Sequence, residues 1–65
     1  MSKVEFDDCK VIRESASGAA ILCLIDGEEH WIPQSQVHDD SEIWKPGDEG
    51  KLVITEWIAI EKKLV

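Results

Sequence analysis

The fold of this chain is decided by the stretch AAILCLI-DG-EEHWIP, residues 19–33, in which Asp26 and Gly27 separate two runs of strand-forming residues. Both central residues of a type I′ turn need a positive φ, and Asp-Gly is among the pairs that best tolerate it, so this is a strong hairpin signal. The pairs expected across the loop are Ile25 with Glu28, Cys23 with His30, and Leu22 with Trp31. The hairpin should end at Pro33, which has no N–H to donate to a ladder.

The segment before the hairpin, residues 4–14, alternates imperfectly between apolar and polar residues. Its apolar side chains fall at Val4 and Phe6 and then, out of phase, at Cys9 and Val11. Because inward residues of a strand recur at every second position, this change of phase indicates one bent strand or two short ones. Small residues at 15–18 then predict a turn, and the apolar run that follows is typical of a central or barrel strand.

The segment after the hairpin predicts a helical turn and a second, weaker hairpin. Residues 34–37 read as one helical turn with Val37 pointing inward, and a polar loop follows. Residues 42–45 then pair with residues 51–54 across a turn in which Gly47, after Pro46, supplies the positive φ of a type II turn.

The C-terminal segment predicts a helix. Thr55 is a good N-cap, and Trp57, Ile60 and Leu64 would share the buried face of a helix over residues 56–65. The alternative is an extended strand, because apolar residues from Leu52 onward also recur with period two.

Together these elements predict a mainly β fold, a small five-stranded barrel of the SH3-like or OB-like kind with a short C-terminal helix. Residues 1–65 form a single domain, and such a chain buries only about 60% of the surface that it exposes when unfolded. A surface, an edge or an oligomer interface is therefore the expected functional part. The chain shows no leader pattern and only two cysteines, so we expect a soluble protein of a reducing cytoplasm.

Negative charge is concentrated in residues 26–49. The formal net charge is −7, and this window holds eight acidic side chains against Lys45 alone, whereas the flanks balance. The eight are Asp26, Glu28, Glu29, Asp39, Asp40, Glu42, Asp48 and Glu49. Binding to a phosphate backbone needs the opposite charge, so direct nucleic-acid binding is disfavoured. The window predicts either a solubilising surface or a surface that docks a basic protein partner.

The tryptophans are the other candidate contact residues. Trp31, Trp44 and Trp57 are, with Phe6, the only aromatic residues. At least one must support so small a core, whereas an exposed one beside the acidic window would be a hot spot for a partner. We expect Trp44 to be that residue, because it lies in the weaker hairpin beside a turn. The predicted partner-binding residues are Glu28, Glu29, Asp39, Asp40, Glu42, Trp44, Asp48 and Glu49.

No pattern in the sequence predicts a catalytic, metal or cofactor site. Cys23 opposite His30 is the minimal arrangement for an activated thiol, but no Asn or Asp is obviously placed to orient the imidazole, which favours simple packing. The cysteines and histidines lack the spacing of a zinc site. The loop donors between His38 and Glu42 lack the ligand spacing of a calcium loop. We expect no catalytic residue, no bound metal and no cofactor.

Three segments resemble a known family. They are DGEEHWIPQSQV at residues 26–37, GDEG at 47–50 and EWIA at 56–59. Over about two thirds of the chain they resemble very short bacteriophage and mobile-element proteins with the pattern D-G-E-x-x-W-I-P-x-S-Q followed by E-W-x-A. The resemblance implies an accessory protein of phages and prophages, often encoded near replication or recombination functions and working in a bacterial host cell. Its partner would be the phage recombination machinery, or a host defence complex that a small acidic inhibitor blocks.

The leading hypothesis is thus a non-enzymatic binding module that docks a basic protein through an acidic face. One alternative is single-stranded nucleic-acid binding through an aromatic face, for which Trp44 with Lys45 and Lys51 is the only cluster. Another is a small-metabolite sponge, which would have to be an oligomer because one chain has little room for a pocket. The marginal core is also consistent with a homodimer.

Overall fold

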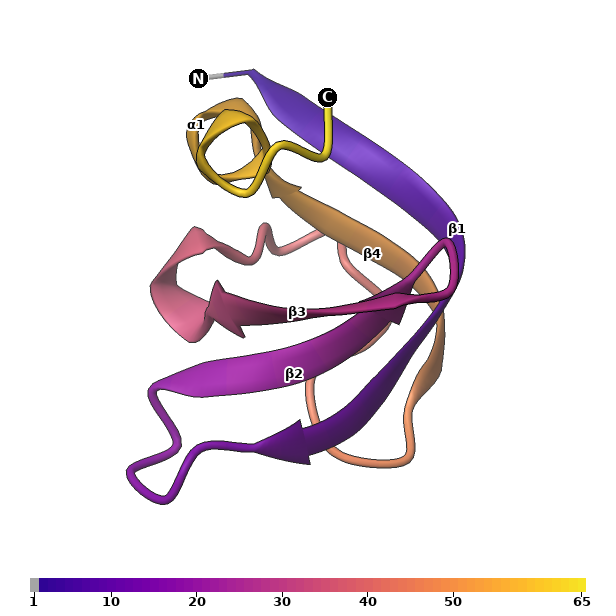
Figure 1. Ribbon diagram of the computed structural model, residues 1–65, viewed down its shortest axis with the longest axis vertical. Helices are drawn as coiled ribbons and strands as arrows, with labels where there is room; N and C mark the ends of the chain where they lie inside the picture. The colour runs from indigo at the N-terminus through magenta and orange to yellow at the C-terminus, as the bar shows by residue number, and fades with distance from the viewer. Residues whose placement is uncertain (1) are drawn as a thin grey trace.

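The computed structural model describes residues 2–65, about half of which belong to one antiparallel sheet. In chain order the elements are β1 (Lys3–Glu14), β2 (Ala20–Ile25), β3 (Glu28–Pro33), the 3-10 turn η1 (Gln34–Gln36), β4 (Glu49–Thr55) and α1 (Glu56–Glu61). The strand order is β3-β2-β1-β4. Figure 1 shows the strands strongly coiled, with α1 and the C-terminus beside the beginning of β1. The prediction of a mainly β domain with a short C-terminal helix is confirmed.

The β2–β3 hairpin has the predicted turn and register. Asp26 and Gly27 have φ angles of 51° and 82°, as a type I′ turn requires. The strand pairs are those expected, including Ile25 with Glu28, Cys23 with His30 and Leu22 with Trp31. Pro33 ends β3 opposite Ala20, at a position where its missing N–H does not interrupt the β2–β3 ladder. The hairpin is therefore fixed by local sequence.

The strand β1 is a single bent strand of 12 residues that pairs with two neighbours. Its residues 3–10 pair with β4 and its residues 10–14 with β2, and its register shifts between Phe6 and Cys9 and again between Val11 and Arg13. Asp8 lies inside the first shift with φ 57°, and a bulge of this kind bends a strand and increases its twist. The change of phase in the sequence is thus explained by a bulge.

The second hairpin is not formed as predicted. Residues 38–48 form loops and turns, and the only main-chain hydrogen bond from residues 42–45 to β4 joins the Glu42 N–H to the Lys51 carbonyl, at 2.8 Å. Gly47 has the expected positive φ of 94°. Gly47 and Asp48 form main-chain hydrogen bonds to β1 instead of to β4. The Gly47 N–H donates to the Val11 carbonyl at 2.9 Å, and the Val11 N–H donates to the Asp48 carbonyl at 2.9 Å.

The expected five-stranded barrel is consequently not confirmed. Residues 2–65 contain four strands, and their sheet is not closed. After η1, which matches the predicted helical turn, Val37 forms a single bridge with Ile54 on the outer edge of β4. The chain then leaves that edge as a loop, so the fifth expected strand is replaced by irregular structure.

The core lies on the inner face of the coiled sheet. Each strand contributes alternate residues, and the loop after η1 and helix α1 add the remaining ones. The buried cluster consists of Cys9, Val11, Ile21, Cys23, Ile25, Ile32, Val37, Ile43, Leu52, Ile54, Ile58 and Ala59. Because these residues come from every element except η1, the loops and the helix are held by the same packing that holds the sheet.

The C-terminal helix forms, but its buried face differs from the prediction. Thr55 caps it as expected, since its hydroxyl accepts a hydrogen bond from the Ile58 N–H at 3.3 Å, and the extended alternative is wrong. The buried residues are Ile58 and Ala59, whereas Trp57 and Ile60 are 57% and 58% exposed. The predicted face assumed a longer helix, whereas α1 has only six residues and its phase is set by β4 running directly into it.

The helix ends in a Schellman motif. The N–H groups of Lys63 and Leu64 donate to the carbonyls of Ile60 and Ala59, at 3.0 and 2.8 Å. Leu64 consequently packs against the core although it lies beyond the helix. Lys63 has φ 58°, which favours glycine over residues that carry a Cβ.

Replacing Lys63 with glycine should therefore stabilise the fold, by about 0.5–1 kcal/mol. Lys62→Gly is the matched control, because Lys62 has φ −89° and glycine there should lower stability by a similar amount. Urea unfolding of the three proteins measures both effects, and a destabilised Lys63→Gly variant would contradict the assignment.

Candidate protein-interaction surface

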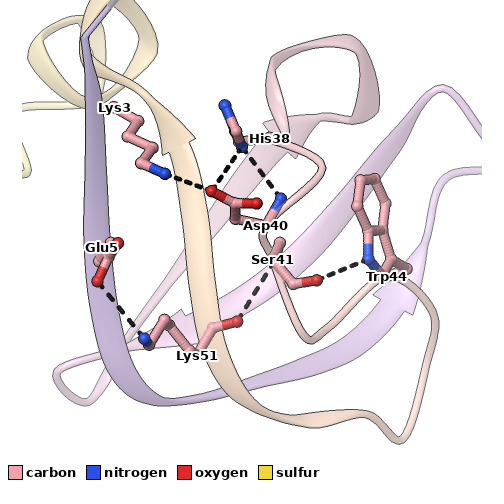
Figure 2. A network of polar contacts seen from close by, with 7 residues as sticks. All are labelled: Lys3, Glu5, His38, Asp40, Ser41, Trp44 and Lys51. Atoms are coloured by element: carbon pink, nitrogen blue, oxygen red, sulfur yellow. Dashed lines mark hydrogen bonds and ion pairs between the residues drawn. The ribbon is translucent and has the colours of Figure 1, made fainter.

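A polar network holds the loop after η1 against β1 and β4 (Figure 2). Asp40 pairs with the Lys3 ammonium, and its own N–H donates to Nδ1 of His38 at 3.0 Å. Lys51 Nζ lies 3.5 Å from Oε1 of Glu5 on the same side. The lysine partner holds the pKa of Asp40 below its ordinary value, and Asp40 in turn raises the pKa of Lys3. The Asp40 carboxylate is thus already paired with Lys3 of the same chain and is not free to pair with another protein.

Two further predicted partner-binding carboxylates also support loops. Asp48 Oδ2 accepts hydrogen bonds from the N–H groups of Trp44 and Lys45, at 2.9 and 3.1 Å. These two bonds lower the pKa of Asp48. Glu42 Oε1 accepts from the Lys51 N–H at 2.9 Å. Each of these carboxylates replaces a hydrogen bond that a regular hairpin would have supplied.

Trp44 does not have the exposed position that the sequence suggested. It is half-buried, packs against the core and donates from Nε1 to the Ser41 carbonyl at 3.0 Å. The exposed tryptophans are instead Trp31, at 40%, and Trp57, at 57%. Trp31 lies opposite Leu22, which is 4% exposed although it faces away from the main core.

The remaining predicted carboxylates are exposed, and no hydrogen bond or ion pair with a lysine or arginine is found for them within residues 2–65. They are Glu28, Glu29, Asp39 and Glu49. Asp26, which belongs to the acidic window but not to the predicted partner-binding residues, is exposed as well. Glu28 and Glu29 lie on β3, directly after the turn that contains Asp26. Asp39 lies in the loop after η1, and Glu49 begins β4 beside Lys10. The eight acidic residues thus come from the β2–β3 hairpin, from the loops after η1 and from the beginning of β4.

The fold adds Asp7 and Asp8 to the hairpin carboxylates. Lys10 pairs with Leu24, so the bend of β1 at Asp7 and Asp8 lies at the same end of the β1–β2 ladder as the β2–β3 turn at Asp26 (Figure 1). Burial raises the pKa of the Cys9 thiol most, and the charges of Asp26, Asp7 and Asp8 raise it further. We call Asp7, Asp8, Asp26 and Glu28 the acidic corner. Sequence counting missed Asp7 and Asp8, because nearby lysines balance them along the chain. The signal that could have found them is the break in alternation between Phe6 and Cys9.

The thiol and imidazole chemistry weighed for Cys23 is not supported by its surroundings. Cys23 lies opposite His30 as predicted, but it is fully buried, and this burial raises its pKa to about 12. Cys9 is buried too, with its pKa raised to about 11, first by desolvation and then by Asp26. Both cysteines are free. A nucleophilic thiol needs a lowered pKa, so these side chains act as core residues.

His30 has one unusual feature. Its Nε2 atom is buried without a hydrogen-bond partner among the residues described, and it lies 3.6 Å from Oε1 of Glu28. Nowhere in the described part of the chain, His30 included, are three Cys, His, Asp or Glu side chains placed to hold a metal ion, and no pocket is found there. No helix within residues 2–65 has the length and hydropathy to cross a membrane.

Comparison of this chain with protein-family models, with curated proteins and with solved structures finds no match in any of the three. We therefore infer the function from the side chains and from the fold that brings them together.

The Lys3–Asp40 pair should make stability depend on pH in the acid range. Because the pKa of Asp40 is lowered in the folded state, its contribution is complete above the ordinary value of 3.8 and is lost as the pH falls through the folded value. Asp40→Asn should melt a few degrees below the wild type at pH 7, and this difference should vanish near pH 2. Asp39→Asn is the control, and an equal effect of both substitutions would contradict the assignment.

The two thiols should be unreactive in the folded chain. At pH 8 a disulfide reagent should modify Cys9 and Cys23 at least about a hundredfold more slowly than a thiol in a short peptide, because burial disfavours the thiolate. In guanidinium chloride both should react at the peptide rate. Fast labelling of Cys23 without denaturant would revive the nucleophile hypothesis.

Proposed function

We propose that this protein is a non-enzymatic binding module that docks a basic protein partner through the acidic corner. The observation that carries the proposal is the register of β1 with β2: Lys10 pairs with Leu24, so the bend at Asp7 and Asp8 and the turn at Asp26 lie at the same end of that ladder. Folding brings these like charges together, which costs electrostatic free energy in the absence of a counter-charge. A cationic partner surface would relieve that repulsion, and it would also be steered toward this side of the molecule.

The opposite behaviour of the other acidic residues supports this choice of surface. On the side of β1 and β4, Lys3 and Lys51 neutralise Asp40 and Glu5. At the acidic corner, no ion pair with a lysine or arginine is found within residues 2–65, and Oε1 of Glu28 lies 3.6 Å from Nε2 of His30. The negative potential is therefore least compensated at the corner, although the net charge of −7 belongs to the whole chain.

We assign the protein to the phage and mobile-element accessory proteins that its sequence resembles, and its fold to the small SH3-like barrels. The 3-10 turn after β3 and the bridge between Val37 and Ile54 support this assignment of the fold. A partner that handles nucleic acid, in phage recombination or in host defence, would carry the cationic surface that the corner requires. Such a partner places the protein in the bacterial cytoplasm.

Neutralising the corner without changing its backbone tests the proposal. Asp26→Asn with Glu28→Gln removes two charges, and asparagine keeps the positive φ of the turn. Glu14→Gln with Glu61→Gln is the matched control, because it removes two exposed charges elsewhere. With tagged chain expressed in a bacterial host, one basic protein should co-purify with the wild type and the control. Calorimetry on the purified pair should give binding about tenfold weaker for the corner variant.

Two results would contradict this function. Equal affinity of the corner and control variants for the partner would show that the acidic corner is only solubilising. Saturable binding of a single-stranded oligonucleotide, with quenching of tryptophan fluorescence and a steep salt dependence, would favour the aromatic alternative. That alternative has one favourable feature, since Trp31 and Arg13 both lie opposite Leu22 on the outer face of the sheet.

A further inference from the structure

The strand β3 is an edge of the sheet with nothing paired to its outer side. It is the first strand in the order β3-β2-β1-β4, and the chain after it crosses to the opposite edge, where Val37 bridges Ile54. The outer side of β4 is thus partly covered by the returning chain, whereas β3 is paired only with β2 within residues 2–65. A free edge of this kind is a template for a further strand.

The hairpin register fixes which main-chain groups of β3 are unpaired. In a two-residue hairpin the pair that closes the turn, Ile25 with Glu28, exchanges hydrogen bonds, and so do alternate pairs beyond it. The N–H and C=O groups of Glu29 and Trp31 therefore point away from β2. Outside the strand ladders, no main-chain hydrogen bond to these groups is found in the described part of the chain, and β3 forms a ladder only with β2. Pro33 is the next outward residue and offers only a carbonyl, which ends the usable edge.

The side chains on this edge define the chemistry of the strand that would pair with it. Glu28 and Glu29 are exposed carboxylates on opposite faces of β3, and Trp31 is 40% exposed two residues beyond Glu29. A lysine or arginine opposite Glu29 or Glu28 would gain a cross-strand ion pair. A long or cationic side chain opposite Trp31 would stack on its indole ring.

We propose that the free edge of β3 binds an extended, basic segment of the partner by strand addition, with main-chain hydrogen bonds to Glu29 and Trp31. This inference rests on the proposed function, for which it supplies the mode of docking. Main-chain pairing would provide affinity, and Glu28 and Glu29 would select cationic side chains. A second copy of this chain is a poor occupant, because it would bring together two molecules of net charge −7 and two sets of these glutamates.

The test uses an eight-residue peptide of alternating lysine and valine with blocked ends. A second peptide of the same sequence carries a methyl group on every main-chain nitrogen, so that it keeps its charges but cannot donate to a ladder. Amide hydrogen exchange is measured by NMR on the wild-type chain. With the first peptide, exchange at Glu29 and Trp31 should slow at least tenfold, whereas the amides of His30 and Ile32, already paired with β2, should change little. The methylated peptide should bind at least tenfold more weakly.

The remaining outcomes test strand addition at β3 and docking through the acidic corner separately. If both peptides bind equally, with salt-sensitive shifts near Asp26 and no protection of Trp31, strand addition is wrong and acidic docking stands. If neither peptide binds, strand addition is wrong and acidic docking loses support as well. Protection that appears without peptide and grows with protein concentration would assign the edge to a second copy. Glu28→Lys with Glu29→Lys should abolish peptide binding, and Glu14→Lys with Glu61→Lys should not.

Discussion

The bend of β1 is the constraint on which the rest of the structure depends. A single strand pairs with β4 through its residues 3–10 and with β2 through its residues 10–14, so the direction of the whole sheet changes where β1 bends. Asp8 adopts a positive φ within that bend, and the extra residue restores inward alternation from Cys9 onward. Inner-face residues of every strand consequently converge on one core, which 65 residues could not build from a flat sheet.

The same bend determines how the negative charge is distributed. Some carboxylates stabilise the chain's own loops. Asp48 and Glu42 accept hydrogen bonds from main-chain N–H groups in the region where the second hairpin was expected. Asp40 is used similarly, in an ion pair with Lys3. For the carboxylates at the β1 bend and the β2–β3 turn, no lysine or arginine partner is found within residues 2–65, and the turn leads directly into the edge strand β3. A charge count alone cannot distinguish these two groups, because they differ only in what surrounds them.

The tryptophans and the helix show where local patterns were insufficient. Trp44 was expected at the surface because its hairpin is weak, but the loop folds back and its indole packs on the core with its N–H bonded. Trp57 was expected inside because a helical wheel over ten residues placed it there. The helix is shorter, and packing of Ile58 and Ala59 decides its orientation. In both cases contacts with distant segments outweighed the local periodicity.

Features whose physical causes are local could be predicted from the amino-acid sequence. The Asp26–Gly27 turn sets the hairpin register, Thr55 caps the helix, and the phase change before Cys9 marks the bend, because turn dihedrals, capping bonds and strand alternation act over a few residues. The position of Asp7 and Asp8 beside the hairpin turn and the unpaired edge of β3 are visible only in the folded chain. Those features depend on how a coiled sheet brings distant strands together, which no short pattern encodes.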